Sequence, residues 1–146
     1  MTKNLTLDHQ LCFSIYAASH AFNRFYRPLL EPLGLTYPQY LVLLALWEED
    51  NLPLKTIGTR LLLDSGTLTP LVRRMDEAGL VTRTRDAADE RLVRVRLTAK
   101  GKRLRAKAEA FPEQIGKASH CSATELAALT RLVFGLREDL DAASAA

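Results

Sequence analysis

The sequence predicts a mainly α-helical domain with one small β-hairpin. Most of the chain shows apolar side chains at helical spacings of three and four. One pair of short segments alternates with period two around a polar turn. The 146 residues suffice for one domain with a hydrophobic core and are too few for two comfortable ones. We therefore expect a single domain over residues 1–146.

Four helices are predicted in the first half of the chain. Apolar residues recur at spacings of four and three over residues 7–33. A second helix has Pro38 in its first turn and continues through the apolar block 40–47. Two short helical patterns, residues 54–62 and 65–78, follow with only a few residues between them.

The predicted hairpin comes directly after this helix pair. Residues 80–85 and 92–97 alternate β-branched residues and threonine with arginine, and residues 86–90 are expected to turn between them. A tight helix pair followed at once by a basic hairpin is the order of elements in a winged helix. The sequence therefore predicts a winged helix-turn-helix.

Further helices complete the chain. Residues from Thr98 onward resume a helical pattern, which Pro112 is expected to kink or restart. Ser122-Ala123-Thr124-Glu125 has the S-x-x-E form of a capping box before a last helix at residues 126–140. The tail, residues 142–146, is expected to fray.

Charge is distributed unevenly along the chain. Twelve basic and five acidic side chains lie between Arg73 and Lys107, a net charge of +7, whereas the remainder carries −4 within the total of +3. A basic segment on an otherwise acidic molecule is typical of a protein that binds a polyanion. A solvated charged face is the other interpretation, but the winged architecture of the same segment favours nucleic acid.

In a winged helix-turn-helix, the second helix of the pair lies in the major groove with its first residues near base edges. Here those residues are small and mostly hydroxyl-bearing, and two arginines follow them. Pro70 fits the first turn of this helix if the helix begins near Thr67. The predicted DNA contacts are Ser65, Gly66, Thr67, Thr69, Arg73, Arg74, Arg83, Arg85 and Arg91.

The hairpin is expected to add positive charge. Four arginines alternate along its strands and can place charge on one face of it. They are Arg83, Arg85, Arg94 and Arg96. Arg91, at the tip, is predicted to enter a minor groove, which attracts arginine where it is narrow. A surface ion pair with Asp89 or Glu90 is the alternative interpretation of Arg91.

Beside the apolar stripe of the first helix lies a stripe of small and polar-aromatic residues: Cys12, Tyr16, Ser19, Asn23 and Tyr26. Such a stripe is usually the flank of a packed helix, and a lone buried cysteine is usually inert. Cys12 and Tyr26 stand about 21 Å apart on one straight helix. They can meet if two copies of the helix run antiparallel across a twofold axis. Phenol hydroxyls around a thiol would stabilise its thiolate.

Other features exclude several classes of protein. The two cysteines, Cys12 and Cys121, are too few for a disulfide framework. Neither His9 with Cys12 nor His120 with Cys121 has the spacing of a closed zinc site, so we expect no metal and no cofactor. No apolar run approaches the roughly 20 residues of a membrane span, and the N-terminus lacks a signal-peptide pattern. We expect a cytoplasmic protein.

Two segments carry a family resemblance: residues 7–48, with LCF, YAAS and LTYPQY, and residues 64–101, with DSGTLTPL. Together they resemble the MarR family, and within it the organic-hydroperoxide-responsive repressors of the OhrR type. The resemblance implies a dimeric winged-helix repressor. Residues 5–35 and 108–146 would form the dimerisation region, and residues 36–107 would bind DNA.

The resemblance also implies roles for single residues. Cys12 would be the peroxidatic sensor, hydrogen-bonded by Tyr26 and Tyr37 of the other subunit, with Tyr16 as a further aromatic neighbour. Some members of the family have a second, resolving cysteine, and Cys121 indicates that type. An organic hydroperoxide would convert Cys12 to a sulfenic acid, followed by an intersubunit disulfide with Cys121. The resulting motion would release a pseudo-palindromic operator in double-stranded DNA.

Three alternatives stand beside this hypothesis. A MarR-type repressor could be released by a noncovalent phenolic or lipophilic ligand, with Cys12 incidental. A purely architectural DNA binder would be indifferent to oxidant. A thiol peroxidase would leave the basic winged segment unexplained, and we therefore do not expect an enzyme.

Overall fold

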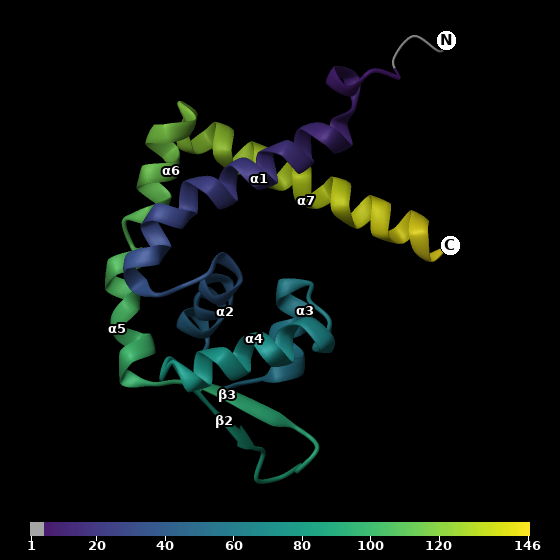
Figure 1. Ribbon diagram of the computed structural model, residues 1–146. Coiled ribbons are helices and arrows are strands. Elements are labelled where there is room, and N and C mark those ends of the chain that lie inside the picture. Colours follow the sequence, from purple (N-terminus) through teal and green to yellow (C-terminus); the bar gives the residue numbers. More distant parts are fainter. Residues whose placement is uncertain (1–4) are drawn as a thin grey trace. The chain divides into compact units, whose positions relative to one another are not determined.

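The computed structural model describes residues 5–146 and is mainly helical (Figure 1). Residues 1–4, which the predicted domain includes, lie outside the described residues. The helices are α1 (Leu11–Leu30), α2 (Tyr37–Glu48), α3 (Leu54–Leu61), α4 (Ser65–Glu77), α5 (Ala99–Ala108), α6 (Phe111–Ser119) and α7 (Ala123–Ala145). The short 3-10 helices are η1 (Leu7–His9) and η2 (Glu31–Leu33), and the strands are β1 (Leu52–Pro53), β2 (Val81–Arg85) and β3 (Val93–Leu97).

The chain divides into two compact units, one ending at Ala106 and the other formed by Lys107–Ala146. The first unit contains α1 to α4, the sheet and most of α5. The second contains α6 and α7. The mainly helical class with a small β-hairpin is confirmed, and the assignment of residues 5–35 and 108–146 to dimerisation stays a prediction.

The first unit is built around α2, which is buried along its length. Thr36 caps this helix: its hydroxyl accepts from the backbone N–H of Gln39 (3.4 Å), and the Gln39 side chain accepts from the backbone N–H of Thr36 (3.1 Å). Helices α1, α3 and α4 and strand β3 all contact α2. The most deeply buried side chains of this core are Leu30, Val42, Leu43, Leu46, Ile57, Leu68, Val72, Met75, Leu80, Val81 and Val95.

The sheet has three antiparallel strands in the order β1-β3-β2. The predicted hairpin, β2 and β3, pairs from Val81 with Leu97 to Arg85 with Val93. It extends beyond the helix pair as a long two-stranded arm (Figure 1). Strand β1 was not predicted, because two residues show no period. Pro53 fits its edge position, since proline has no N–H to give to a ladder.

Several predicted boundaries differ from the structure. The expected helix at residues 7–33 is an α-helix flanked by 3-10 turns, and Gly34 ends it in the left-handed region (φ 68°). A new helix begins at Phe111 with Pro112 in its first turn, as expected. The capping box of Ser122 and Glu125 is present. The frayed tail was a wrong prediction, because α7 continues to Ala145.

No single helix among residues 5–146 combines the length and the apolar composition needed to cross a membrane. Residues 11–33 together with α2 pass that test only as a pair bent by 72°, by length and composition alone.

Gly101, in the first turn of α5, permits a close approach between α5 and the end of the helix pair. A Cβ at this position would collide with the carbonyl oxygen of Leu80 and lie 3.1 Å from the Cδ2 of Leu97. Gly101→Ala is therefore expected to lower the free energy of unfolding by about 1–3 kcal/mol through overpacking. Gly116→Ala in α6, whose Cβ would meet only Leu126 at 4.0 Å, is the matched control.

The control is expected to be neutral or to stabilise by up to about 1 kcal/mol, because alanine has the higher helix propensity. Thermal or urea denaturation of both variants measures the difference. Equal stabilities would show that the approach of α5 to Leu80 does not require glycine.

Candidate nucleic-acid interface and thiol site

Helix α4, the predicted reading helix, begins at a capped and exposed end. The Asp64 carboxylate accepts a hydrogen bond from the backbone N–H of Thr67 (2.8 Å). Hydrogen bonds from the side chain and the backbone of Thr67 hold the pKa of this carboxyl below its usual value. The helix starts at Ser65, so Pro70 lies inside it rather than in its first turn. The Gly66 carbonyl therefore lacks the usual helical donor.

The two sides of α4 divide as predicted. Leu68, Leu71, Val72 and Met75 are buried and hold the helix on the core. The predicted contacts on the other side are accessible, with only Thr69 half-buried. The exposed ones are Ser65, Gly66, Thr67, Arg73 and Arg74. This side of α4 therefore presents hydroxyls near its first turn and two cations further along.

The tip of the hairpin is organised by two carboxylates. Asp86 accepts from the backbone N–H groups of Ala88 (2.8 Å) and Asp89 (3.0 Å) and pairs with the guanidinium of Arg94. Asp89 accepts from the backbone N–H of Arg91 (3.1 Å) and from its guanidinium (3.0 and 3.1 Å). The bonds from Arg94 and Arg91 are the main reason why the pKa of Asp86 and that of Asp89 lie below their usual values.

Arg91 pairs with Asp89, which is the alternative interpretation of this residue. Its side chain is nevertheless 89% exposed. A surface pair of this kind contributes little to stability, so the guanidinium can exchange Asp89 for another anion at small cost. Contact between Arg91 and a minor groove stays a prediction.

The four strand arginines do not share one face of the hairpin, so that prediction was wrong. Arg83 lies opposite Val95 and Arg85 opposite Val93, whereas Arg94 lies opposite Thr84. Cross-strand partners point to the same face and neighbours along a strand to opposite faces. The pair on β2, Arg83 and Arg85, therefore lies on one face, and the pair on β3, Arg94 and Arg96, on the other.

Three of these arginines have partners within the chain, and Arg85 donates to the backbone carbonyl of Glu90 (3.2 Å). The Nε of Arg83 donates to Asp76 of α4 (3.0 Å). Arg94 pairs with Asp86 and also donates to the backbone carbonyl of Asn51 (2.9 Å). Arg94 thereby ties the hairpin to the segment before α3, which is a structural role.

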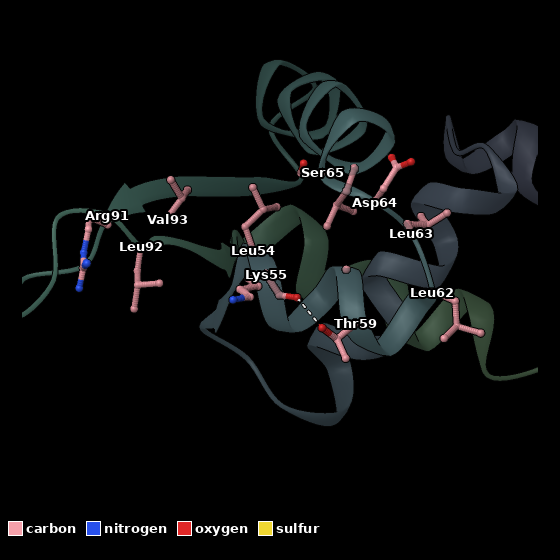
Figure 2. A pocket seen from close by; sticks show the side chains of 12 residues that line it. Leu54, Lys55, Thr59, Leu62, Leu63, Asp64, Ser65, Arg91, Leu92 and Val93 are labelled. Carbon is pink, nitrogen blue, oxygen red and sulfur yellow. Dashed lines mark hydrogen bonds between the residues drawn. The ribbon is translucent and has the colours of Figure 1, made fainter. Parts of the chain in front are cut away.

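A groove of about 840 Å³ separates the two predicted DNA-contacting elements (Figure 2). Its walls come from α3, the first turn of α4 and the hairpin, with Ser65 on one side and Arg91 and Leu92 on the other. Leu62 stands at its rim in the left-handed region (φ 58°) and is 60% exposed. The groove therefore separates the first turn of α4 from the hairpin tip, the two regions that are predicted to contact DNA.

Cys12 is a free, exposed thiol in the first turn of α1. Tyr26 lies 14 residues further along the same uninterrupted helix, about 21 Å away along its axis, so the two side chains cannot meet within one chain. Tyr16 is also exposed, and its ring packs on His20 with the centroids 4.4 Å apart. The structure therefore places Cys12 and Tyr26 at different ends of α1, whereas Tyr16 lies one turn from the thiol and Tyr37 belongs to α2.

Two of the predicted partners, Tyr26 and Tyr37, form a phenol cluster with Tyr40, in which Tyr26 and Tyr40 are buried and Tyr37 is half-buried. The ring centroid of Tyr26 lies 4.9 Å from that of Tyr37 and 5.5 Å from that of Tyr40. Tyr40 was not among the predicted site residues. Its position three residues after Tyr37, on the same side of α2, was the available signal.

The phenols of this cluster keep their protons to unusually high pH. Burial, followed by the neighbouring Tyr40 and Tyr37, raises the pKa of Tyr26 well above its ordinary value. Burial is also the main reason for the raised pKa of Tyr37 and of Tyr40. All three hydroxyls are therefore hydrogen-bond donors at neutral pH.

Cys121 lies in the second unit, between α6 and α7, and is half-buried. Its thiol is 3.5 Å from the backbone carbonyl of Ser119, and its backbone N–H donates to the Ser119 hydroxyl (3.2 Å). Within the described part of the chain, no group of three or more His, Cys, Asp or Glu side chains is arranged to hold a metal ion.

A helix pair with an exposed polar reading edge, joined to a basic β-arm, defines a winged-helix DNA-binding regulator. The family model described as transcriptional regulator SarA/Rot matches residues 24–108, more than half of the chain. The chain belongs to this family of transcriptional regulators.

Two relatives are similar over nearly the whole chain. The HTH-type transcriptional regulator TtmR of Methylorubrum extorquens is 51% identical over 94% of this chain and 70% of its own length. The organic hydroperoxide resistance transcriptional regulator of Bacillus subtilis is 45% identical over 94% of this chain and 93% of its own. Both are regulators and not enzymes. The resemblance to OhrR-type regulators and the prediction of a non-enzymatic protein are confirmed.

Solved structures of AbfR, a protein of Staphylococcus epidermidis, show the same fold. Reduced AbfR bound to DNA is 38% identical, with a TM-score of 0.80, and the match covers 96% of each chain. Disulfide-formed AbfR is 40% identical, with a TM-score of 0.65 over 89% of this chain and 91% of that one. The predicted winged-helix fold is confirmed.

Because of the phenol cluster, we expect the free energy of unfolding to vary with pH in the alkaline range. The folded state holds the Tyr26 proton above pH 10, where the unfolded chain loses it. The cluster's contribution is therefore complete below pH 10, and the free energy of unfolding is expected to fall as the pH rises further. Tyr26→Phe should reduce this slope in urea denaturation series at increasing pH. A slope equal to that of the parent chain would contradict the assignment.

Proposed function

We propose that the chain is a homodimeric repressor that binds double-stranded DNA and releases it when an organic hydroperoxide oxidises Cys12. The observation that carries the proposal is the separation of the exposed Cys12 thiol, at the start of α1, from a cluster of phenol donors at the other end of α1 and the start of α2. Such an arrangement becomes a reactive site when a second copy brings its own α1 alongside. The protein acts in the cytoplasm, where it meets its operator.

Exposed apolar side chains support the homodimer. Helix α1 leaves Leu11 62% and Phe22 47% exposed in the single chain. Helix α7 does the same with a longer set: Leu129, Leu132, Val133, Phe134 and Leu140. Apolar residues in such numbers on two helices are typical of a surface that another chain covers. Both helices lie in the segments predicted to dimerise.

Two copies of the winged unit would present two reading helices to a pseudo-palindromic operator. The exposed residues near the start of α4 would approach the major groove, and Arg73 and Arg74 the phosphates. Arg91 would reach the minor groove from the hairpin tip. AbfR, which shares the fold, has been solved bound to DNA.

The redox step needs only the thiol, a hydroperoxide and hydrogen-bond donors that stabilise the thiolate. The Cys12 sulfur attacks the distal peroxide oxygen, so an S–O bond forms as the O–O bond breaks and the alcohol leaves with a proton. Sulfur is oxidised to a sulfenic acid while the peroxide is reduced. The hydroxyls of the partner's Tyr26 and Tyr37 would stabilise the thiolate before attack, and Tyr16 would flank it.

Cys121 would then resolve the sulfenic acid. Its thiol attacks the oxidised sulfur of Cys12 in the other subunit, a disulfide forms, and the oxygen leaves as water. A disulfide requires a Cα–Cα distance of about 4.4–6.8 Å, so the helices that carry the two cysteines would have to move. That motion would alter the spacing of the reading heads. AbfR, which shares the fold, has also been solved in a disulfide-formed state.

Substitution of the two cysteines tests the mechanism. In gel-shift assays on the DNA upstream of its own gene, Cys12→Ser is expected to bind like the parent chain and to ignore organic hydroperoxide. Cys121→Ser should still form the sulfenic acid at Cys12, but it should give no crosslinked dimer on a non-reducing gel and should release DNA less completely. Full release of the Cys12→Ser variant by hydroperoxide would refute the thiol mechanism. Release of that variant only by a phenolic or lipophilic compound would favour a ligand-gated repressor.

Arg91→Ala tests the hairpin contact. We expect weaker DNA binding and a salt dependence whose slope is smaller by about one, because one cation leaves the phosphates and groove. Lys117→Ala, which removes an exposed cation of α6 that pairs with Glu113, is the control. Fluorescence anisotropy over a range of salt concentrations measures both slopes. Identical slopes for the two variants would show that Arg91 does not contact the DNA.

A further inference from the structure

The phenol cluster contains a residue that none of the proposed steps uses. Tyr40 is 4% exposed and shares a hydrogen bond between hydroxyls with Tyr26. On its other side the Tyr40 ring meets Trp47 edge-on, with the centroids 6.2 Å apart. The indole N–H of Trp47 donates to the backbone carbonyl of Gly101 (3.0 Å). Tyr40 is therefore held between the proposed thiol partner and an anchored indole.

We propose that Tyr40 is a positioning residue of the thiol site: its hydroxyl holds that of Tyr26 in place and so sets the reactivity of the partner's Cys12. This inference rests on the proposed function, because it assigns a role within that site. Tyr40 does not need to touch the sulfur. It acts through the Tyr26 hydroxyl.

The chemistry of the phenol group gives the reason. A tyrosine hydroxyl has one hydrogen to donate and an oxygen that can accept. In the single chain this bond acts to raise the pKa of Tyr26 and to lower that of Tyr40, so Tyr26 donates to the Tyr40 oxygen. When Tyr26 donates to a thiolate instead, the bond must reverse and run from the Tyr40 hydroxyl to the Tyr26 oxygen. That bond polarises the Tyr26 O–H and strengthens its donation to sulfur, since chained hydrogen bonds reinforce one another. Without it, the Tyr26 hydroxyl is free to rotate away.

The packing of the Tyr40 ring allows the effect of its hydroxyl to be measured separately from that of the ring. Tyr40 lies on α2 between two aromatic neighbours, so a phenylalanine keeps the ring contacts and removes only the hydroxyl. If Tyr40 serves only to fill the core, this change leaves thiol chemistry untouched. If it positions Tyr26, the change weakens thiolate stabilisation while the fold and DNA affinity persist.

The test uses the dimer in a Cys121→Ser background, so that oxidation of Cys12 is a single event. Two quantities are measured: the rate of sulfenic acid formation with cumene hydroperoxide, and the pH profile of Cys12 alkylation by iodoacetamide. Tyr40→Phe is expected to slow oxidation about threefold to tenfold, the effect of one hydrogen bond, and to move the alkylation profile to higher pH. The reduced variant should bind DNA and melt like the parent.

A double-mutant cycle separates action through Tyr26 from a general effect. In a Tyr26→Phe background, adding Tyr40→Phe should produce no further slowing. Additive effects, or an unchanged rate in Tyr40→Phe beside a slowed Tyr26→Phe, would overturn the positioning role and leave the proposed function intact. Parent-like rates in Tyr26→Phe, Tyr37→Phe and Tyr40→Phe alike would overturn the proposed phenol-assisted thiol site itself.

Discussion

The burial of α2 is the constraint on which the first unit depends. Its apolar block leaves no polar face, so the helix must be surrounded, and α1, α3, α4 and β3 supply the cover. Its buried polar side chain, Gln39, takes part in the capping box, where it accepts a hydrogen bond from the backbone of Thr36. Tyr37 and Tyr40 lie near the start of this buried helix and Trp47 near its end. Trp47 bonds to Gly101, which in turn lies against Leu80 and Leu97 at the base of the hairpin.

Helix α1, unlike α2, is buried only towards one end. It is anchored only near its C-terminal end, where Tyr26 and Leu30 are buried, while its first turns, with Cys12 and Tyr16, are exposed. One end of the helix thus belongs to the core of the first unit, and the other has apolar and aromatic side chains that the described residues leave exposed. This division accounts for the separation of thiol and phenols. Under the proposed function, a thiol kept apart from these phenol donors would gain them when two chains assemble, which would link a redox response to the dimeric state.

Regular features were predictable from the sequence, and features set by register or tertiary contact were not. Helices and strands with long periodic patterns were located to within a few residues. Cys12 and Tyr26 were singled out by their spacing and Tyr37 by the family resemblance, and the roles of all three stay predictions. Strand β1 has two residues and no period. The faces of Arg83 and Arg94 depend on the pairing register, which the sequence of the turn does not reveal. Tyr40 was missed because it opens an apolar run and reads as core; only its contacts with Tyr26 and Trp47 distinguish it.

The arginines of the basic segment have different roles, which follow from the pairing of β2 with β3. Asp86 is 12% exposed and holds Arg94, which also bonds to Asn51, so this pair stabilises the arm and is not free to meet DNA. Arg91 faces solvent, and its pair with Asp89 is of the weakly stabilising kind. A phosphate can therefore replace Asp89 on Arg91 without disturbing the turn, because Asp86 keeps the bonds from the Ala88 and Asp89 backbone that shape it. Positive charge together with the winged architecture marks the segment as a DNA-binding one, and pairing within the chain decides which cations are available to a duplex.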